Sequence, residues 1–157
     1  MKDQLIQFST NQGFKIFLPE NRMPYQQSAL EKYGSYEIET EKILRHFVKP
    51  GMNVVECGAC CGYHALNLAK AVGDTGRVYC FEANSELMDI LSLNIEINGF
   101  SDRTEIINKG IWIEKDVLLL PIQKSGCDGA RFGYNSEKSK NIKQVIKQKL
   151  KGAMKNQ

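Results

Sequence analysis

The sequence lacks any apolar run near the roughly 20 residues that a membrane-spanning helix needs, and its N-terminus lacks the apolar core of a signal peptide. It has no second Cys-x-x-Cys pair beside Cys57-x-x-Cys60. Its two histidines, His46 and His64, stand at no matching spacing, so we predict no metal site. Five cysteines are an odd number, which favours reduced thiols and a cytoplasmic protein.

Two nucleotide-binding signatures are also missing. The chain contains neither the Gly-x-Gly-x-x-Gly of dinucleotide enzymes nor the Gly-Lys-Ser/Thr of a P-loop. What it does contain is 157 residues with 42% hydrophobic and 25% charged residues. This composition is ordinary for one globular domain with a real core.

The central stretch reads as strand, glycine turn and helix. An apolar run ends at Glu56, Gly58 and Gly62 flank a tight turn, and residues 65–69 continue at helical spacing. Residues 77–81 supply a following strand, so the unit is a right-handed βαβ crossover. Gly58 allows the chain to turn sharply, and Gly62 allows the backbone to approach a ligand closely.

Two acids decide which ligand suits this turn. Glu82 follows the second strand, at the crevice where open α/β sheets bind ligands, and its carboxylate can accept hydrogen bonds from both hydroxyls of a ribose. Glu56 would repel a pyrophosphate but suits the ammonium group of an amino acid. A ligand with a ribose and an amino-acid end fits best, and S-adenosylmethionine is that ligand.

The remaining elements predict an α/β fold with a Rossmann-like, mostly parallel sheet. Asn84 and Ser85 can cap the second helix of the core, which Asn98 and Gly99 close. In chain order we expect a hairpin over residues 5–18, an irregular segment over 21–34, and helices over 40–48 and 84–98. Two further strands are expected over residues 104–108 and 117–120, and residues 109–112 would extend the strand over 104–108.

Three acids stand at the start of the helix over residues 40–48. We interpret Glu37, Glu39 and Glu41 as solvated groups that complement the helix dipole. The alternative is that Glu37 reaches the amino end of the ligand.

The C-terminal segment has a different character. Residues 123–135 read as a loop, and residues 131–157 hold eight basic residues and one acid. An apolar stripe on this segment predicts a basic amphipathic helix, which fits contact with nucleic acid, a membrane surface or simply the parent domain. The stripe consists of Ile142, Val145, Ile146, Leu150 and Ala153.

An ordered set of motifs resembles the FkbM family of S-adenosylmethionine-dependent methyltransferases. The resemblance runs from about Tyr36 to Trp112 and implies a class I methyltransferase fold. Family members mostly methylate hydroxyls of sugars and other small molecules. The matching residues are Glu37, Lys49–Gly51, Val54–Ala59, Gly62–Tyr63, Leu68–Ala69, Gly76–Tyr79, Phe81–Glu82, Asn84, Asn94–Ile95 and Asn98–Gly99.

The resemblance also implies a cofactor pocket. Glu82 would hold the ribose, and Asn108 and Lys109 would lie by the adenine. The first turn would contribute Glu56, Gly58, Ala59, Cys60, Gly62 and Tyr63, with Ala83 and Asn84 beside the adenosine.

The chain departs from the family pattern in several places. Members commonly have Asn where Cys60 stands, Pro where Ala83 stands, and an aromatic residue or Thr in place of His64. They continue with a Lys-Ile-Asp-Val-Glu-Gly-like segment, and nothing after Pro121 matches it.

From the residues and the resemblance together we predict three units within one domain: residues 1–35, a cofactor-binding core over 36–122, and a tail over 123–157. His64 is the candidate general base for an acceptor hydroxyl on a saccharide or small molecule. The alternatives are an inactive cofactor-binding remnant or partner subunit, and an RNA or tRNA methyltransferase. Because uncovered edge strands are a liability, we expect the tail helix, a protein partner or a second copy to cover the sheet edge.

Overall fold

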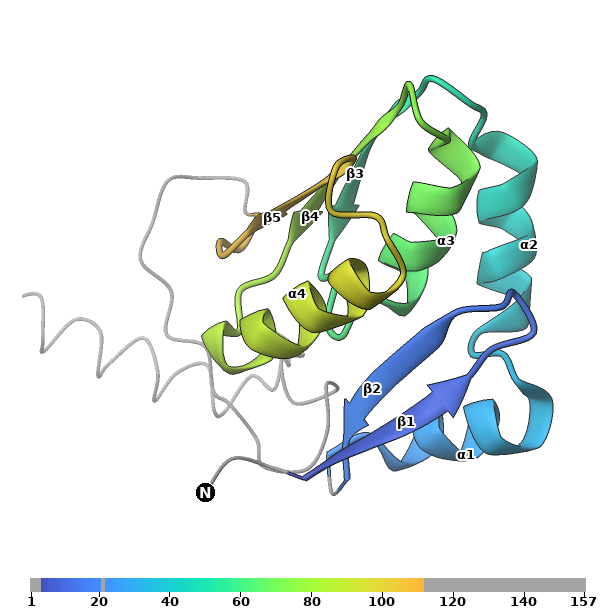
Figure 1. Cartoon of the computed structure of the whole chain (residues 1–157), viewed down its shortest axis with the longest axis vertical. Coiled ribbons are helices and arrows are strands. Elements are labelled where there is room, and N and C mark those ends of the chain that lie inside the picture. The colour runs from blue at the N-terminus through green and yellow to red at the C-terminus, as the bar shows by residue number, and fades with distance from the viewer. Residues whose placement is uncertain (1–3, 21, 112–157) are drawn as a thin grey trace, which may run out of the picture.

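The computed structural model describes residues 4–20 and 22–111, which form a hairpin followed by an α/β unit (Figure 1). The order is β1 (Leu5–Ser9), β2 (Lys15–Pro19), α1 (Pro24–Tyr33), α2 (Ile38–Phe47), β3 (Asn53–Cys57), α3 (Tyr63–Val72), β4 (Arg77–Phe81), a 3₁₀ turn η1 (Ser85–Leu87), α4 (Met88–Ile97) and β5 (Thr104–Ile107). The predicted α/β class is confirmed.

Strands β3, β4 and β5 form a parallel sheet in that order. Glu56 lies opposite Cys80, and Phe81 lies opposite Ile107. The alternation of side chains along β4 explains the layering. Val78 and Cys80 are fully buried beneath the helices, while Tyr79 between them points to the other face. Figure 1 shows α3 and α4 on the same side of this sheet.

The predicted N-terminal hairpin is confirmed. β1 pairs with β2 in antiparallel fashion, and Gly13 turns the chain with a φ of 84°. Two asparagines, one in α4 and one that caps its C-terminal end, attach the hairpin to the core. The Asn94 side chain accepts a hydrogen bond from the Phe17 N–H at 2.7 Å and donates to the Phe17 carbonyl at 2.9 Å. Asn98 does the same at Lys15, so two side-chain amides bond the edge of β2 as a neighbouring strand would.

The interpretation of residues 21–34 as irregular was wrong, because most of this segment is helix α1. Pro24 stands in its first turn, where the missing N–H costs nothing, and Gly34 ends it in the left-handed conformation. Gln26 and Leu30 are its buried residues, so hydrophobic periodicity was too weak to reveal it.

The helix over residues 40–48 is confirmed as α2, but its apolar stripe is only partly used. Leu44 and Val48 pack against the core, whereas Ile43 and Phe47 lie exposed. The one buried residue of α2 is Glu41.

Strand β5 ends at Ile107, so the extension to residues 109–111 was wrong: their backbone does not continue the ladder. The predicted strand over 117–120, the loop and the basic tail helix lie outside the described residues.

One hydrophobic cluster runs from the hairpin into the α/β unit and joins Phe8 and Ile16 with Leu66, Val78 and Leu91. Within residues 4–20 and 22–111, no helix combines the length and the apolar character needed to cross a bilayer.

Candidate cofactor site

The turn after β3 is held against the end of β4 by backbone hydrogen bonds. The N–H groups of Gly58 and Ala59 both donate to the Phe81 carbonyl, at 2.8 and 3.0 Å. Gly58 has a φ of 86°, and no atom of the described residues lies within 4 Å of where its Cβ would stand. Gly62 has a φ of 91°, and a Cβ there would meet the Leu91 side chain at 2.8 Å. Close packing on α4 therefore requires this glycine, in addition to its backbone conformation.

Glu82 is the acid at the carboxyl end of β4, and its side chain is fixed on both oxygens. One oxygen accepts from the Cys60 N–H at 2.8 Å, and the other accepts from the Asn84 N–H at 2.7 Å. Cys60 reaches this position with a φ of 53°, which is rare for a residue with a side chain. Glu82 is only 6% exposed, yet a carboxylate has about four acceptor positions, so two remain for a ligand.

Glu56 lies at the end of β3 beside Cys80, whose thiol is 3.5 Å from a Glu56 carboxylate oxygen. The pKa of Glu56 is raised to about 7, mainly by burial; the contact with Cys80 opposes this rise, and the negative charge of Glu82 adds a smaller contribution to it. The carboxyl is thus close to its midpoint of ionisation at neutral pH, and a cation beside it would favour the charged form.

The end of β5 meets the end of β4 at the same edge of the sheet. Asn108 donates from its side chain to the Glu82 carbonyl at 2.8 Å, which links the two strand ends. Ala83 is exposed, and a Cβ on Gly110 would stand 3.5 Å from the Cβ of Ala83. Lys109 is exposed and close in sequence to this edge. Asn84 caps the 3₁₀ turn by accepting from the Glu86 N–H.

His64 and Glu37 are brought together although 27 positions separate them. The His64 Nε2 atom is 2.9 Å from a Glu37 carboxylate oxygen. This contact holds the pKa of Glu37 below its ordinary value. Burial opposes the lowering to a smaller extent, and a hydrogen bond with Tyr36 adds to it. Glu37 stands just before α2 with a φ of 50°, and the buried Nδ1 atom of His64 makes no hydrogen bond to the described residues.

Glu41 is the residue that the sequence interpretation missed. It was expected to be solvated, but it is only 5% exposed and accepts hydrogen bonds from three side chains. The donors are Gln12 at 2.6 Å, Arg45 at 2.7 Å and the Tyr63 hydroxyl at 2.7 Å. Burial raises the pKa of Tyr63, and the hydrogen bond to Glu41 raises it further. The Tyr63 side chain therefore points to α2, while Glu39 remains an exposed partner of Lys42.

The predicted site residues form two groups. One group gathers at the carboxyl edge of the sheet: Glu56, Gly58, Ala59, Cys60, Gly62, Glu82, Ala83, Asn84, Asn108 and Lys109. The other group links the starts of α2 and α3 and consists of Glu37, Tyr63 and His64. The tight turn joins the two groups, because Gly62 directly precedes Tyr63.

This parallel sheet with an acid at two adjacent strand ends has the fold of a class I S-adenosylmethionine-dependent methyltransferase. The solved structure of TYW2 from P. horikoshii, in complex with MeSAdo, aligns with a TM-score of 0.53 and 21% identity, over 69% of this chain and 37% of that chain. At this identity the likeness concerns the fold alone.

The sequence comparison defines the family more closely. The family model of protein-L-isoaspartate(D-aspartate) O-methyltransferase matches residues 14–113, and the chain belongs to this family. S-adenosylmethionine is accordingly its cofactor. The FkbM family, which the motifs resemble, is not the family found, although both predict the same fold and cofactor.

Two relatives illustrate the match. A protein-L-isoaspartate O-methyltransferase of Methanothrix thermoacetophila is 36% identical over 40% of this chain and 30% of its own length. Another, of Pyrobaculum neutrophilum, is 33% identical over 59% of this chain and 47% of its own length. The chain thus matches less than half of either relative.

Proposed function

We propose that this chain binds S-adenosylmethionine at the carboxyl edge of its sheet and transfers the methyl group to a carboxylate oxygen of a protein. The doubly fixed carboxylate of Glu82 carries the proposal, because it offers a preformed acceptor for a ribose beside a glycine turn that the described residues leave open. The protein acceptor comes from the family, whose relatives are protein-L-isoaspartate O-methyltransferases.

The cofactor roles divide along the edge of the sheet. We assign the ribose hydroxyls to Glu82 and the ammonium group to Glu56, whose pKa near 7 allows it to become charged when a cation binds. The N-terminus of α3 would face the cofactor's carboxylate end. Asn84, Asn108 and Lys109 border the space for the adenine, next to Ala83.

A carboxylate acceptor needs no general base. An aspartyl-type carboxyl has a pKa near 4, so it is ionised at neutral pH and attacks the methyl group without losing a proton. A hydroxyl acceptor needs a base, which the FkbM resemblance would assign to His64. Here the Nε2 atom of His64 faces Glu37. We therefore propose that the His64–Glu37 pair positions α2 against the cofactor turn.

The cofactor would supply the reactive methyl group, and the protein would supply orientation and exclusion of water. Glu82 and Glu56 would fix the two ends of the cofactor. The acceptor oxygen would then approach in line with the sulfur–methyl bond. The family match favours a protein carboxylate over the saccharide or small-molecule hydroxyl, and over RNA.

The test measures binding and turnover separately. Calorimetric titration with S-adenosylmethionine should give saturable binding, and radiolabelled methyl transfer should be seen on an isoaspartyl peptide but not on the same peptide with normal aspartate. Substitution His64→Ala should lower kcat less than about 10-fold, because no proton transfer is lost; a general base would cost about 100-fold or more. Binding without transfer to any carboxyl peptide would instead support the inactive alternative.

A further inference from the structure

Helix α2 uses its one buried position for an acid, Glu41. This residue is 5% exposed, about as deeply buried as Glu82 at 6%. A buried carboxylate costs free energy unless hydrogen bonds replace the lost water, and an apolar residue would pack the helix at lower cost. Packing alone therefore does not explain an acid at this position.

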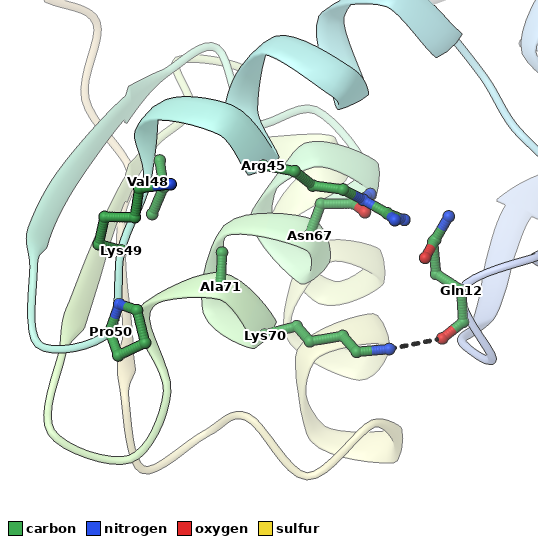
Figure 2. A pocket seen from close by; sticks show the side chains of 8 residues that line it. All are labelled: Gln12, Arg45, Val48, Lys49, Pro50, Asn67, Lys70 and Ala71. Carbon is green, nitrogen blue, oxygen red and sulfur yellow. Dashed lines mark hydrogen bonds between the residues drawn. The ribbon is translucent and has the colours of Figure 1, made fainter.

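Three segments of the chain meet at the Glu41 carboxylate. One oxygen accepts from the Gln12 side chain in the hairpin turn at 2.6 Å and from the Arg45 guanidinium group, one helical turn further along α2, at 2.7 Å. Figure 2 shows these two side chains extending toward each other. The other oxygen accepts from the Tyr63 hydroxyl at 2.7 Å. Both oxygens are thus bonded, and one of them is aimed at α3.

Tyr63 connects this carboxylate to the cofactor turn, residues 58–62. It is the first residue of α3, directly follows Gly62, and is only 2% exposed. Its ring packs edge-on against Tyr36 with the ring centroids 5.9 Å apart, and its carbonyl accepts from the Asn67 side chain at 3.0 Å. The Gly62 N–H donates back to the Ala59 carbonyl at 2.8 Å. A fixed Tyr63 side chain therefore fixes the end of the cofactor turn.

One carboxylate thus holds the cofactor turn from each side. Glu82 accepts from the Cys60 N–H inside the turn, and Glu41 accepts from the Tyr63 hydroxyl directly after it. Gly58 and Gly62 make the turn costly to order, because glycine loses more conformational freedom on folding than any other residue. Contacts on both sides limit the conformations that this turn can adopt.

We propose that Glu41 is a positioning residue of the cofactor site, which holds the cofactor turn in its binding conformation through the Tyr63 hydroxyl. It acts through Tyr63 and not by contact with the cofactor. Gln12 and Arg45 keep its second oxygen bonded, so the carboxylate stays directed at Tyr63. The inference rests on the proposed binding of S-adenosylmethionine at the carboxyl edge, and it adds α2 and the hairpin turn to the elements that shape this site.

Two variants each remove one donor from the same carboxylate. Tyr63→Phe removes the link to the cofactor turn, so S-adenosylmethionine affinity in calorimetry should fall at least about 5-fold, the loss of a hydrogen bond to a charged group. Arg45→Gln breaks an ion pair whose arginine side chain is 46% exposed, so affinity should change less than about 2-fold. Equal losses in the two variants, or no loss in either, would refute the positioning role.

Hydrogen exchange in the cofactor-free protein tests the same role without any ligand. In Tyr63→Phe the amides of Cys60 and Gly62 should exchange at least about 5-fold faster, while the Val78 amide in β4 should exchange as in the unaltered chain. Equal acceleration at Val78 would show general destabilisation and overturn the proposal. Because this measurement needs no cofactor, it decides the role of Glu41 in the turn even if the unaltered chain binds no S-adenosylmethionine, which would refute the proposed cofactor site itself.

A double-mutant cycle tests whether Glu41 and Tyr63 act as one unit. Glu41→Gln should weaken S-adenosylmethionine binding about as much as Tyr63→Phe does. The two substitutions together should weaken it no more than either alone, because both remove the same bond. Losses that multiply in the double variant would show that the two residues act independently and would contradict the proposal.

Discussion

Glu82 combines a structural and a proposed binding role in one carboxylate. Its oxygens accept from the Cys60 and Asn84 N–H groups, and these two bonds shape both sides of the cofactor edge. A carboxylate is required here because both partners are donors, and the amide of Gln would turn its NH₂ group toward one of them.

We therefore expect Glu82→Gln to weaken S-adenosylmethionine binding about 10- to 100-fold, the loss of bonds to a charged acceptor. The variant should also unfold more easily, by about 1–3 kcal/mol, because one buried N–H group loses its partner. Calorimetry and urea unfolding measure the two effects. Glu105→Gln, at an exposed acid on β5, is the control. Unchanged affinity in a destabilised Glu82→Gln protein would reduce Glu82 to a structural role.

Glu56 gives a prediction about pH. Its pKa in the folded protein, about 7, lies above the ordinary value of 4.5, so the folded state holds a proton that the unfolded state releases between these values. The stability that this group contributes is complete below about pH 4.5 and is lost as the pH rises through 7, by at most about 3 kcal/mol. Relative to Glu56→Gln, the natural protein should become less stable over this interval in denaturant titrations. A constant difference between the two proteins would show that the pKa is not raised.

Cofactor binding should depend on pH in the opposite direction. If Glu56 binds the ammonium group, its ionised form is the binding form, so S-adenosylmethionine affinity should increase between about pH 5.5 and 7.5. Glu56→Gln should bind more weakly and lose this dependence. If the affinity of the natural protein for S-adenosylmethionine does not change with pH, another residue binds the ammonium group.

At the scale of elements, the attachment of the hairpin depends on two side-chain amides. Asn94 is fully buried and also donates to the Cys61 carbonyl at 2.8 Å, so one residue links β2, α4 and the cofactor turn. Asn98 makes the equivalent pair of bonds at Lys15 in an exposed position.

Substitution Asn94→Leu keeps the volume but leaves three backbone groups without their partner. We expect a loss of about 3 kcal/mol in unfolding free energy and faster hydrogen exchange at the Phe17 amide. Asn98→Ala should cost about 1 kcal/mol, since water can replace its bonds. Similar small losses for both variants would show that the hairpin is held by apolar packing instead.

The sequence predicted those elements whose signals are local. Gly58, Gly62 and the acids at the ends of β3 and β4 define the βαβ unit, because turn geometry and strand ends follow directly from residue type. Helix α1 was missed because its signals are a proline and a glycine at its two ends, with little apolar periodicity between them. Glu41 was misinterpreted because its burial depends on Gln12, Arg45 and Tyr63, which only the tertiary fold brings together. The contact of His64 with Glu37 is long-range in the same way.

At the scale of the molecule, one face of the parallel sheet carries no helix among the described residues. Parallel sheets occur almost only with both faces covered. Among the described residues, α3 and α4 pack on one face, and Val55 in the middle of β3 is 56% exposed on the other. The sequence suggested that the tail helix or a partner covers the edges of this sheet, and that stays a prediction.

We expect that face to be covered in the protein as a whole, and Val55→Lys tests this. A covered position should lose at least about 2 kcal/mol, because the charge would be buried without a partner. Ile97→Lys is the control: Ile97 is less exposed, at 39%, but it ends α4, where a lysine complements the helix dipole, so its change should stay within about 0.5 kcal/mol. Urea unfolding at several protein concentrations measures both.

A loss of stability that grows with protein concentration would show that a second copy of the chain covers this face, because only association depends on concentration. If Val55→Lys lowers the unfolding free energy no more than Ile97→Lys does, this face of the sheet is open to solvent.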